Sequence, residues 1–160
     1  MLQVADNSSP AEAFAAARAA LEALPSSRRV TADEAEAIYT MVHSAIVQGQ
    51  HDAALRYLAL LTFLKPTQPR YLSSLALTYK LLERFQEALN VYSFLALLEP
   101  DELLHPLAVA ECHLRLQQAL QARALLAFVI DSSEGVAGSE KLHVRAQALL
   151  LLSTRGAVPA

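Results

Sequence analysis

The chain has 160 residues, of which 54% are hydrophobic, and its formal net charge is −3 at pH 7. This length is enough for one domain with a buried core. No run of like charge is longer than two residues, so the basic footprint of a nucleic-acid-binding protein is missing. No apolar stretch approaches the roughly 18 residues of a membrane span, so we expect no membrane insertion.

Alanine and leucine dominate the composition, whereas glycine occurs only four times. These two residues favour helices because they lose little entropy when a helix forms. The single cysteine, Cys112, excludes an intrachain disulfide and favours a reducing compartment. The first ten residues have no basic region, so we expect no secretory signal.

Residues 1–30 are an N-terminal extension with one expected helix at 10–24. Its apolar residues Phe14, Leu21 and Leu24 lie along one side, which is typical of an amphipathic helix. Pro25 and the polar residues after it break the chain. The sequence TADE at 31–34 then forms a capping box, in which Thr31 and Glu34 each satisfy a backbone amide of the other. This box begins the first helix of a domain that spans 31–153.

The domain repeats with an offset of 34 residues, at about 35–68, 69–102 and 103–136. The second half of each unit holds a small residue in the same position: Ala54, Ala88 and Ala122. A second small-residue position lies in the first half: Val42, Ala76 and Ala110. Pro66 and Pro100 close the first two units, and Glu134 replaces the third proline. This period is the tetratricopeptide signature, and the shared offset of several positions disfavours a plain helical bundle.

The sequence therefore predicts an all-α tetratricopeptide-repeat solenoid. Three helix hairpins follow the N-terminal helix, and a capping helix at 140–153 covers the open end before a flexible tail at 154–160. The turns inside the hairpins hold Gly49, Glu83 and Gln117. Because only the first is glycine, we expect the other two turns to close without a positive φ.

The first helix of each hairpin is expected to line the inner surface of the solenoid. Residues spaced i, i+4, i+7 form one stripe along each of these helices. The expected client-binding residues are Tyr39, His43, Ile46, Ser73, Leu77, Lys80, Leu107, Glu111 and Leu114. This largely apolar stripe suits an extended peptide with spaced apolar side chains. The alternative for Leu77, Leu107 and Leu114 is that they are ordinary core residues.

No set of residues indicates catalysis. Cys112 and His113 are adjacent, so on a helix their side chains point about 100° apart and do not form a nucleophile–base pair. We interpret Cys112 as a buried small side chain and His113 as a structural histidine. No two histidines have the spacing of a helical metal site. We therefore expect no enzyme activity, no metal and no cofactor.

Residues 69–116 resemble one tetratricopeptide family, the class II chaperones of bacterial type III secretion systems. The resemblance rests on RY at 70–71, EALNVYSFLAL at 87–97 and, most specifically, HPLAVAECHLRL at 105–116. A weaker resemblance extends from about 31 to 153. It implies a cytoplasmic bacterial protein, with Tyr39 as a groove tyrosine, that binds an extended apolar segment of a secreted pore-forming translocator and keeps it soluble. It also implies homodimers, with the helix at 10–24 as the candidate dimerisation element.

His43 and Ile46 stand where that family usually has aromatic residues, so the client remains open. One alternative is a chaperone for another secreted subunit, such as a needle, filament or tip protein. The other is a tetratricopeptide scaffold that docks a folded partner by its peptide tail.

Overall fold

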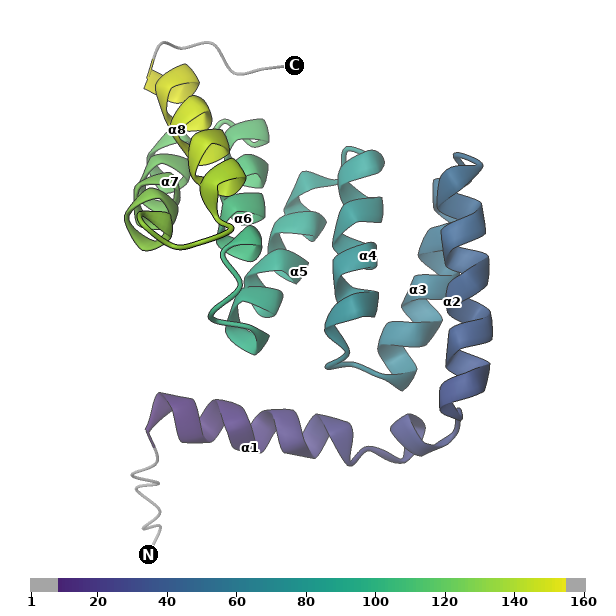
Figure 1. The fold of residues 1–160 in the computed structure, drawn as a ribbon. Coiled ribbons are helices and arrows are strands. Elements are labelled where there is room, and N and C mark those ends of the chain that lie inside the picture. The colour runs from purple at the N-terminus through teal and green to yellow at the C-terminus, as the bar shows by residue number, and fades with distance from the viewer. Residues whose placement is uncertain (1–8, 155–160) are drawn as a thin grey trace, which may run out of the picture.

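The computed structural model describes residues 9–154. Within this range every regular element is helical, and Figure 1 shows their arrangement. The chain begins with α1 (Pro10–Glu22) and a short 3₁₀ helix, η1 (Pro25–Arg28). The helices that follow are α2 (Ala32–Val47), α3 (His51–Leu64), α4 (Pro69–Leu81), α5 (Phe85–Leu98), α6 (Leu104–Arg115), α7 (Ala119–Ser133) and α8 (Glu140–Thr154).

Consecutive helices from α2 to α7 pack as antiparallel pairs that stand beside one another in chain order (Figure 1). The pairs are α2 with α3, α4 with α5 and α6 with α7, and α8 packs on α7 and α6. The predicted all-α fold is thus confirmed, and in the described residues three helix pairs lie between α1 and α8. The capping box that begins α2 is also present, because the Glu34 amide donates to the Thr31 hydroxyl at 3.2 Å and the Thr31 amide donates to Glu34 at 2.9 Å.

The hairpins close tightly at the small residues that the 34-residue offset relates. Ala54, Ala88 and Ala122 are each 0% exposed, and they lie on α3, α5 and α7. Their counterparts Val42, Ala76 and Ala110 on α2, α4 and α6 are at most 1% exposed. Side chains of this size let two helix backbones approach, so larger neighbours such as Leu58, Leu61 and Leu95 complete the core around them.

The turns inside the hairpins differ from the prediction. Gly49 has a φ of 71°, but Glu83 and Gln117 also have positive φ, at 58° and 61°. All three turns make the same bonds: the amide after the positive-φ residue donates at 2.8 Å to the carbonyl five residues before it, as Arg84 does to Tyr79. This is the Schellman motif, whose geometry requires a left-handed residue whatever its side chain. The expectation that two turns would close without positive φ was wrong.

The N-terminal helix crosses below the ends of the hairpins in Figure 1. Its Phe14 packs against a cluster of Leu72, Leu95 and Leu98, and Thr67 donates to Glu22 at 3.0 Å. The helix ends at Glu22 rather than at residue 24, and Leu24 is 41% exposed. Pro25 explains the early end, because a proline disfavours helical backbone at the residue before it.

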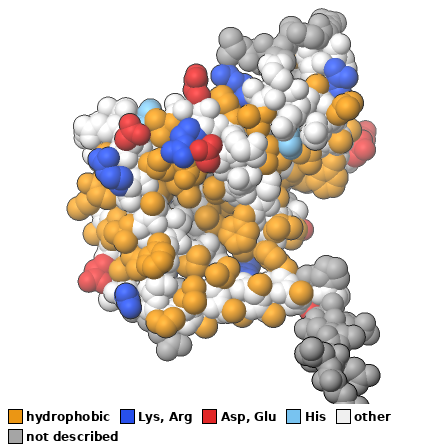
Figure 2. Space-filling model, turned by 180° about the vertical axis from the view of Figure 1, so that it is seen from behind, with side chains coloured by type: hydrophobic (Ala, Val, Ile, Leu, Met, Phe, Trp, Pro, Cys, Tyr) orange, Lys and Arg blue, Asp and Glu red, His pale blue; other side chains and the backbone are white. Residues whose placement is uncertain are grey.

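In the described range no helix is both long and apolar enough to cross a membrane. The expected flexible tail lies, beyond Thr154, outside the described residues. Several large apolar side chains are nevertheless exposed, among them Phe63 at 65%, Leu97 at 60% and Phe128 at 52%. Figure 2 shows hydrophobic side chains spread over much of the rear face and along the helix at its lower edge. Apolar surface on this scale is typical of a protein that binds partners.

Candidate functional site: a groove between α4, α6 and α8

The nine residues expected to bind a client do not form one continuous stripe. Those on α4 and α6 meet around neighbouring pockets, whereas none of those on α2 lines these pockets. On α2, His43 is exposed, and Tyr39 and Ile46 are half-buried and pack against the core of the first hairpin.

Tyr39 joins α2 to α4. Its hydroxyl lies 2.7 Å from the Ser74 hydroxyl, and its ring centroid is 5.3 Å from that of Tyr71. The guanidinium of Arg70 lies over the ring, at 4.0 Å from the centroid, and donates to Glu36 at 2.8 and 3.1 Å. Tyr39 therefore has a structural role, because it connects α2 to α4. It does not line the groove itself, but its partner Ser74 lines a pocket there.

The pocket between α4 and α6, here called the central pocket, has a volume of about 420 Å³. Its walls include Ser73 and Leu77 of α4 and Leu104 of α6, and Leu107 forms part of its floor. A second pocket, here called the Phe85 pocket, adjoins the central pocket and has a volume of about 490 Å³. The apolar residues that line it are Leu77, Leu81, Phe85, Leu114 and Leu149. Both pockets are open and mostly apolar, so each can receive an apolar side chain of a guest.

The three leucines whose role was left open differ in the structure. Leu77 is 44% exposed and lines both pockets, so it is a surface residue of the groove. Leu107 is only 2% exposed and Leu114 only 4%, and both belong to the core cluster that includes Ala146 of α8. These two match the core alternative, because α8 packs over the inner side of α6.

A bridge of charged side chains crosses the groove. Glu111 on α6 accepts from Lys80 on α4 at 2.8 Å through Oε2, and its Oε1 lies 2.6 Å from a guanidinium nitrogen of Arg145 on α8. The Glu111 side chain is 15% exposed, the Lys80 side chain 25% and the Arg145 side chain 58%. Lys80, Glu111 and Arg145, here called the charged bridge, line both the central pocket and the Phe85 pocket.

Arg145 was not predicted from the sequence. The 34-residue offset does reach it, because Arg145 stands 34 residues after Glu111, as Glu111 does after Leu77. The prediction took inner-surface residues only from the first helices of the three hairpins, so it left out the residues of α8.

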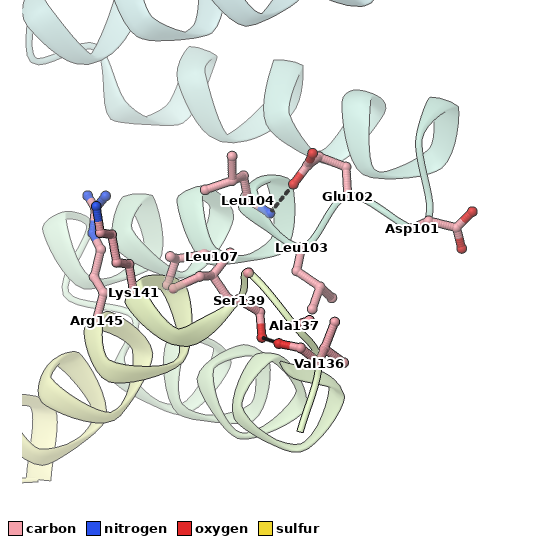
Figure 3. A pocket seen from close by; sticks show the side chains of 12 residues that line it. Asp101, Glu102, Leu103, Leu104, Leu107, Val136, Ala137, Ser139, Lys141 and Arg145 are labelled. Atoms are coloured by element: carbon pink, nitrogen blue, oxygen red, sulfur yellow. Dashed lines mark hydrogen bonds between the residues drawn. The ribbon is translucent and has the colours of Figure 1, made fainter. Parts of the chain in front are cut away.

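A third pocket, of about 440 Å³, lies where α6, α8 and the linker between α7 and α8 meet; it is here called the linker pocket. Figure 3 shows Lys141 and Arg145 together at one side of it and Glu102 and Asp101 towards the other. Leu104 and Leu107 line both this pocket and the central pocket, so the groove continues to the end of the solenoid.

Below the charged bridge lie two weak acids that are held in their neutral forms. Burial raises the pKa of the Cys112 thiol to about 11, and Glu111 adds to the shift while Lys80 opposes it. Burial also raises the pKa of the Tyr92 hydroxyl to about 12. A thiol that is 0% exposed and protonated at neutral pH is a poor nucleophile, as interpreted from the sequence.

His113 and His105 make structural contacts. The His113 Nδ1 atom lies 2.6 Å from Gln118, across the turn between α6 and α7, and His105 Nε2 lies 2.8 Å from Glu99. Among the residues that the structure describes, no three acidic, histidine or cysteine side chains are grouped so as to hold a metal ion. The groove therefore has apolar walls and several charged side chains, of which Lys80, Glu111 and Arg145 are paired with one another.

Models of protein families and the curated proteins gave no match to this chain, but solved structures did. It is similar to PcrH of Pseudomonas aeruginosa in complex with the chaperone binding region of PopD, with 27% identity, a TM-score of 0.72 and coverage of 81% of this chain and 97% of that one. For PcrH with the chaperone binding region of PopB, the identity is 28%, the TM-score 0.69 and the coverage 77% and 99%.

The fold is also that of SycD, the type III secretion translocator chaperone of Yersinia enterocolitica. That structure is 19% identical, with a TM-score of 0.71 and coverage of 80% of this chain and 88% of SycD. Another SycD structure contains an alternative dimer.

Proposed function

We propose that this chain, which has the fold of the type III secretion translocator chaperones, binds an extended apolar segment of a secreted translocator and keeps that client soluble until export. The observation that carries the proposal is the groove between α4, α6 and α8, with Leu77 exposed between two apolar pockets. PcrH, which is similar over most of both chains, forms complexes with the chaperone binding regions of PopD and PopB.

The groove has the shape and the apolar walls that this function requires. Pore-forming proteins carry apolar segments that aggregate in water, and capture of one strand keeps the rest of the chain from associating. An extended strand places alternate side chains on one face, so pockets spaced along the groove can each take one of them. Binding of this kind requires no catalysis, and we accordingly propose a cytoplasmic binding protein rather than an enzyme.

Leu77 provides the direct test. The chain is co-expressed with a pore-forming type III protein of its own host, and the soluble fraction of that client is measured. We expect the client to be soluble with the wild-type chain and insoluble with Leu77→Asp, because a carboxylate in the groove opposes apolar anchors.

Leu97→Asp is the matched control. Leu97 is also an exposed leucine on a helix, at 60%, but it lines none of the three groove pockets. A client that is equally soluble without the chain would contradict the proposal. So would equal loss of solubility with Leu97→Asp and Leu77→Asp, since the groove would then not be the binding site.

We propose that α1, the helix that was expected at 10–24, joins two copies of the chain. Apart from Phe14, most side chains of α1 are exposed, and those exposed are largely alanines that another helix can approach closely. Ala16→Glu places a charge on this surface, and Ala127→Glu on α7 is the control, because Ala127 is also exposed. Sedimentation velocity should show a dimer for the wild type and the control, and a monomer for Ala16→Glu. A monomeric wild type would refute the proposal.

A further inference from the structure

The charged bridge lies in the path of any strand that fills both apolar pockets. The central pocket and the Phe85 pocket share Leu77, Lys80, Glu111 and Arg145, so the bridge stands where the two pockets meet. A client with one apolar anchor in each pocket must therefore pass over these three charges. The exposed charged groups of the bridge then determine which client side chain can bind between the two apolar anchors.

The bridge presents positive charge. Two cations share one carboxylate, and the more buried group is the carboxylate, whose two oxygens are already taken by Lys80 and Arg145. Arg145 is the most exposed of the three, at 58%, and a guanidinium has five donors, of which Glu111 engages only part. Lys141, one turn before Arg145 on α8, adds a further positive charge in the linker pocket.

Resting on the proposed function, we propose that the charged bridge is a selectivity site that accepts an acidic side chain of the client between its two apolar anchors. The carboxylate of the client accepts hydrogen bonds from those N–H groups of Arg145 that Glu111 does not engage. Glu111 remains paired with Lys80. Hydrogen bonds between a guanidinium and a carboxylate are short and strong, and the half-enclosed groove screens them less than open surface would.

Charges in the linker pocket also favour an acidic client residue at the charged bridge. Asp101 and Glu102 line the linker pocket together with Lys141 and Arg145, and Figure 3 places the two acids away from the two cations. An acidic client residue is repelled beside Asp101 and Glu102 and attracted at the charged bridge. Charge thus favours one register of the client, in addition to the apolar pockets, which accept many side chains.

The test uses synthetic extended peptides with two leucines and a polar spacer that carries aspartate, asparagine or lysine at one scanned position. Binding is measured by fluorescence anisotropy. At the favoured position we expect the aspartate peptide to bind about five- to tenfold more tightly than its asparagine twin, and the lysine peptide to bind most weakly. The preference should weaken as salt is added.

Two variants locate the effect. Arg145→Gln should abolish the preference for aspartate, and Arg145→Lys should retain part of it. Arg84→Gln is the control, because Arg84 is likewise an exposed arginine 2.6 Å from a glutamate, Glu87, but lines none of the groove pockets. Circular dichroism checks that each variant is folded.

The outcomes separate the two proposals. Equal binding of the aspartate and asparagine peptides, or a preference that survives Arg145→Gln, would overturn the selectivity site and leave the apolar groove in place. If no leucine peptide binds, the groove does not take extended apolar segments, and the proposed function falls with the selectivity site.

Discussion

The guanidinium of Arg70 lies 4.0 Å from the centroid of the Tyr39 ring, and the Tyr39 hydroxyl lies 2.7 Å from that of Ser74. These contacts tie α2, the first helix of the first hairpin, to α4 of the second. Arg70 is fixed in turn by two bonds to Glu36. The first hairpin is thus held to the rest of the solenoid by polar contacts as well as by the core.

Tyr39→Phe should lower the free energy of unfolding by about 1 kcal/mol, because it removes one half-buried hydrogen bond. Tyr39→Ala should cost about 2–3 kcal/mol, since the contacts with Tyr71 and Arg70 are also lost. Urea denaturation measures both values. Ser74→Ala is the partner variant: combined with Tyr39→Phe it should cost no more than either change alone. Full additivity of the two would show that the hydroxyls do not interact.

The turns provide a second prediction. Glu83 and Gln117 adopt positive φ, a conformation that costs an L-residue roughly 1 kcal/mol and costs glycine little. Gln117→Gly should therefore raise the free energy of unfolding by about 0.5–1 kcal/mol, despite the greater freedom of glycine in the unfolded chain. Gly49→Ala is the reverse experiment and should destabilise by a similar amount. A Gln117→Gly variant less stable than the wild type in thermal denaturation would contradict the strain argument.

The hairpins were predictable because the sequence repeats the residues that touch. A backbone crossing tolerates only small side chains, so Ala54, Ala88 and Ala122 recur at a fixed offset and mark the contact. The turn geometry was not predictable in the same way. The Schellman hydrogen bonds enforce positive φ at Glu83 without a glycine to signal it.

The groove was predicted in part. Helical spacing grouped Leu77, Lys80 and Glu111, and the structure brings all three together around the central pocket and the Phe85 pocket, because spacing fixes which face of a helix a residue occupies. It does not fix what covers that face. Leu107 is buried because α8 packs over α6, which depends on how the last helix docks and not on the repeat pattern. Arg145 follows Glu111 at the 34-residue offset, so a prediction that extended the offset into the last helix would have included it.

The buried alanines give a third prediction, with a control on the same helix. Ala122 on α7 is 0% exposed, whereas Ala124, two residues later, faces solvent. Ala122→Glu forces a carboxylate into a closed helix crossing and should destabilise by about 3 kcal/mol or more. Ala124→Glu has the same helix propensity change and should stay within about 0.5 kcal/mol of the wild type. Equal destabilisation by the two variants would mean that helix propensity, rather than the crossing, is responsible.

Cys112 and Tyr92 make the fold sensitive to alkaline pH. The folded-state pKa of Cys112 is about 11, above its ordinary value of 9.0, and that of Tyr92 is about 12, above 10.0. Between these values the unfolded chain loses its protons first, so stability falls as pH rises. The contribution of Cys112 is intact below pH 9.0 and is lost as the pH passes about 11.

Urea denaturation at a series of pH values from neutral to alkaline should show this loss. Cys112→Ala should be less stable at neutral pH, because it leaves a small cavity, but its stability should fall less steeply with pH, by roughly 2 kcal/mol across the range. Tyr92→Phe should flatten the upper part of the curve. The thiol should also resist Ellman's reagent in the folded protein and react at once in urea. Parallel pH curves for the wild type and both variants would refute the assignment, because the buried thiol and hydroxyl would then titrate alike in the folded and unfolded chains.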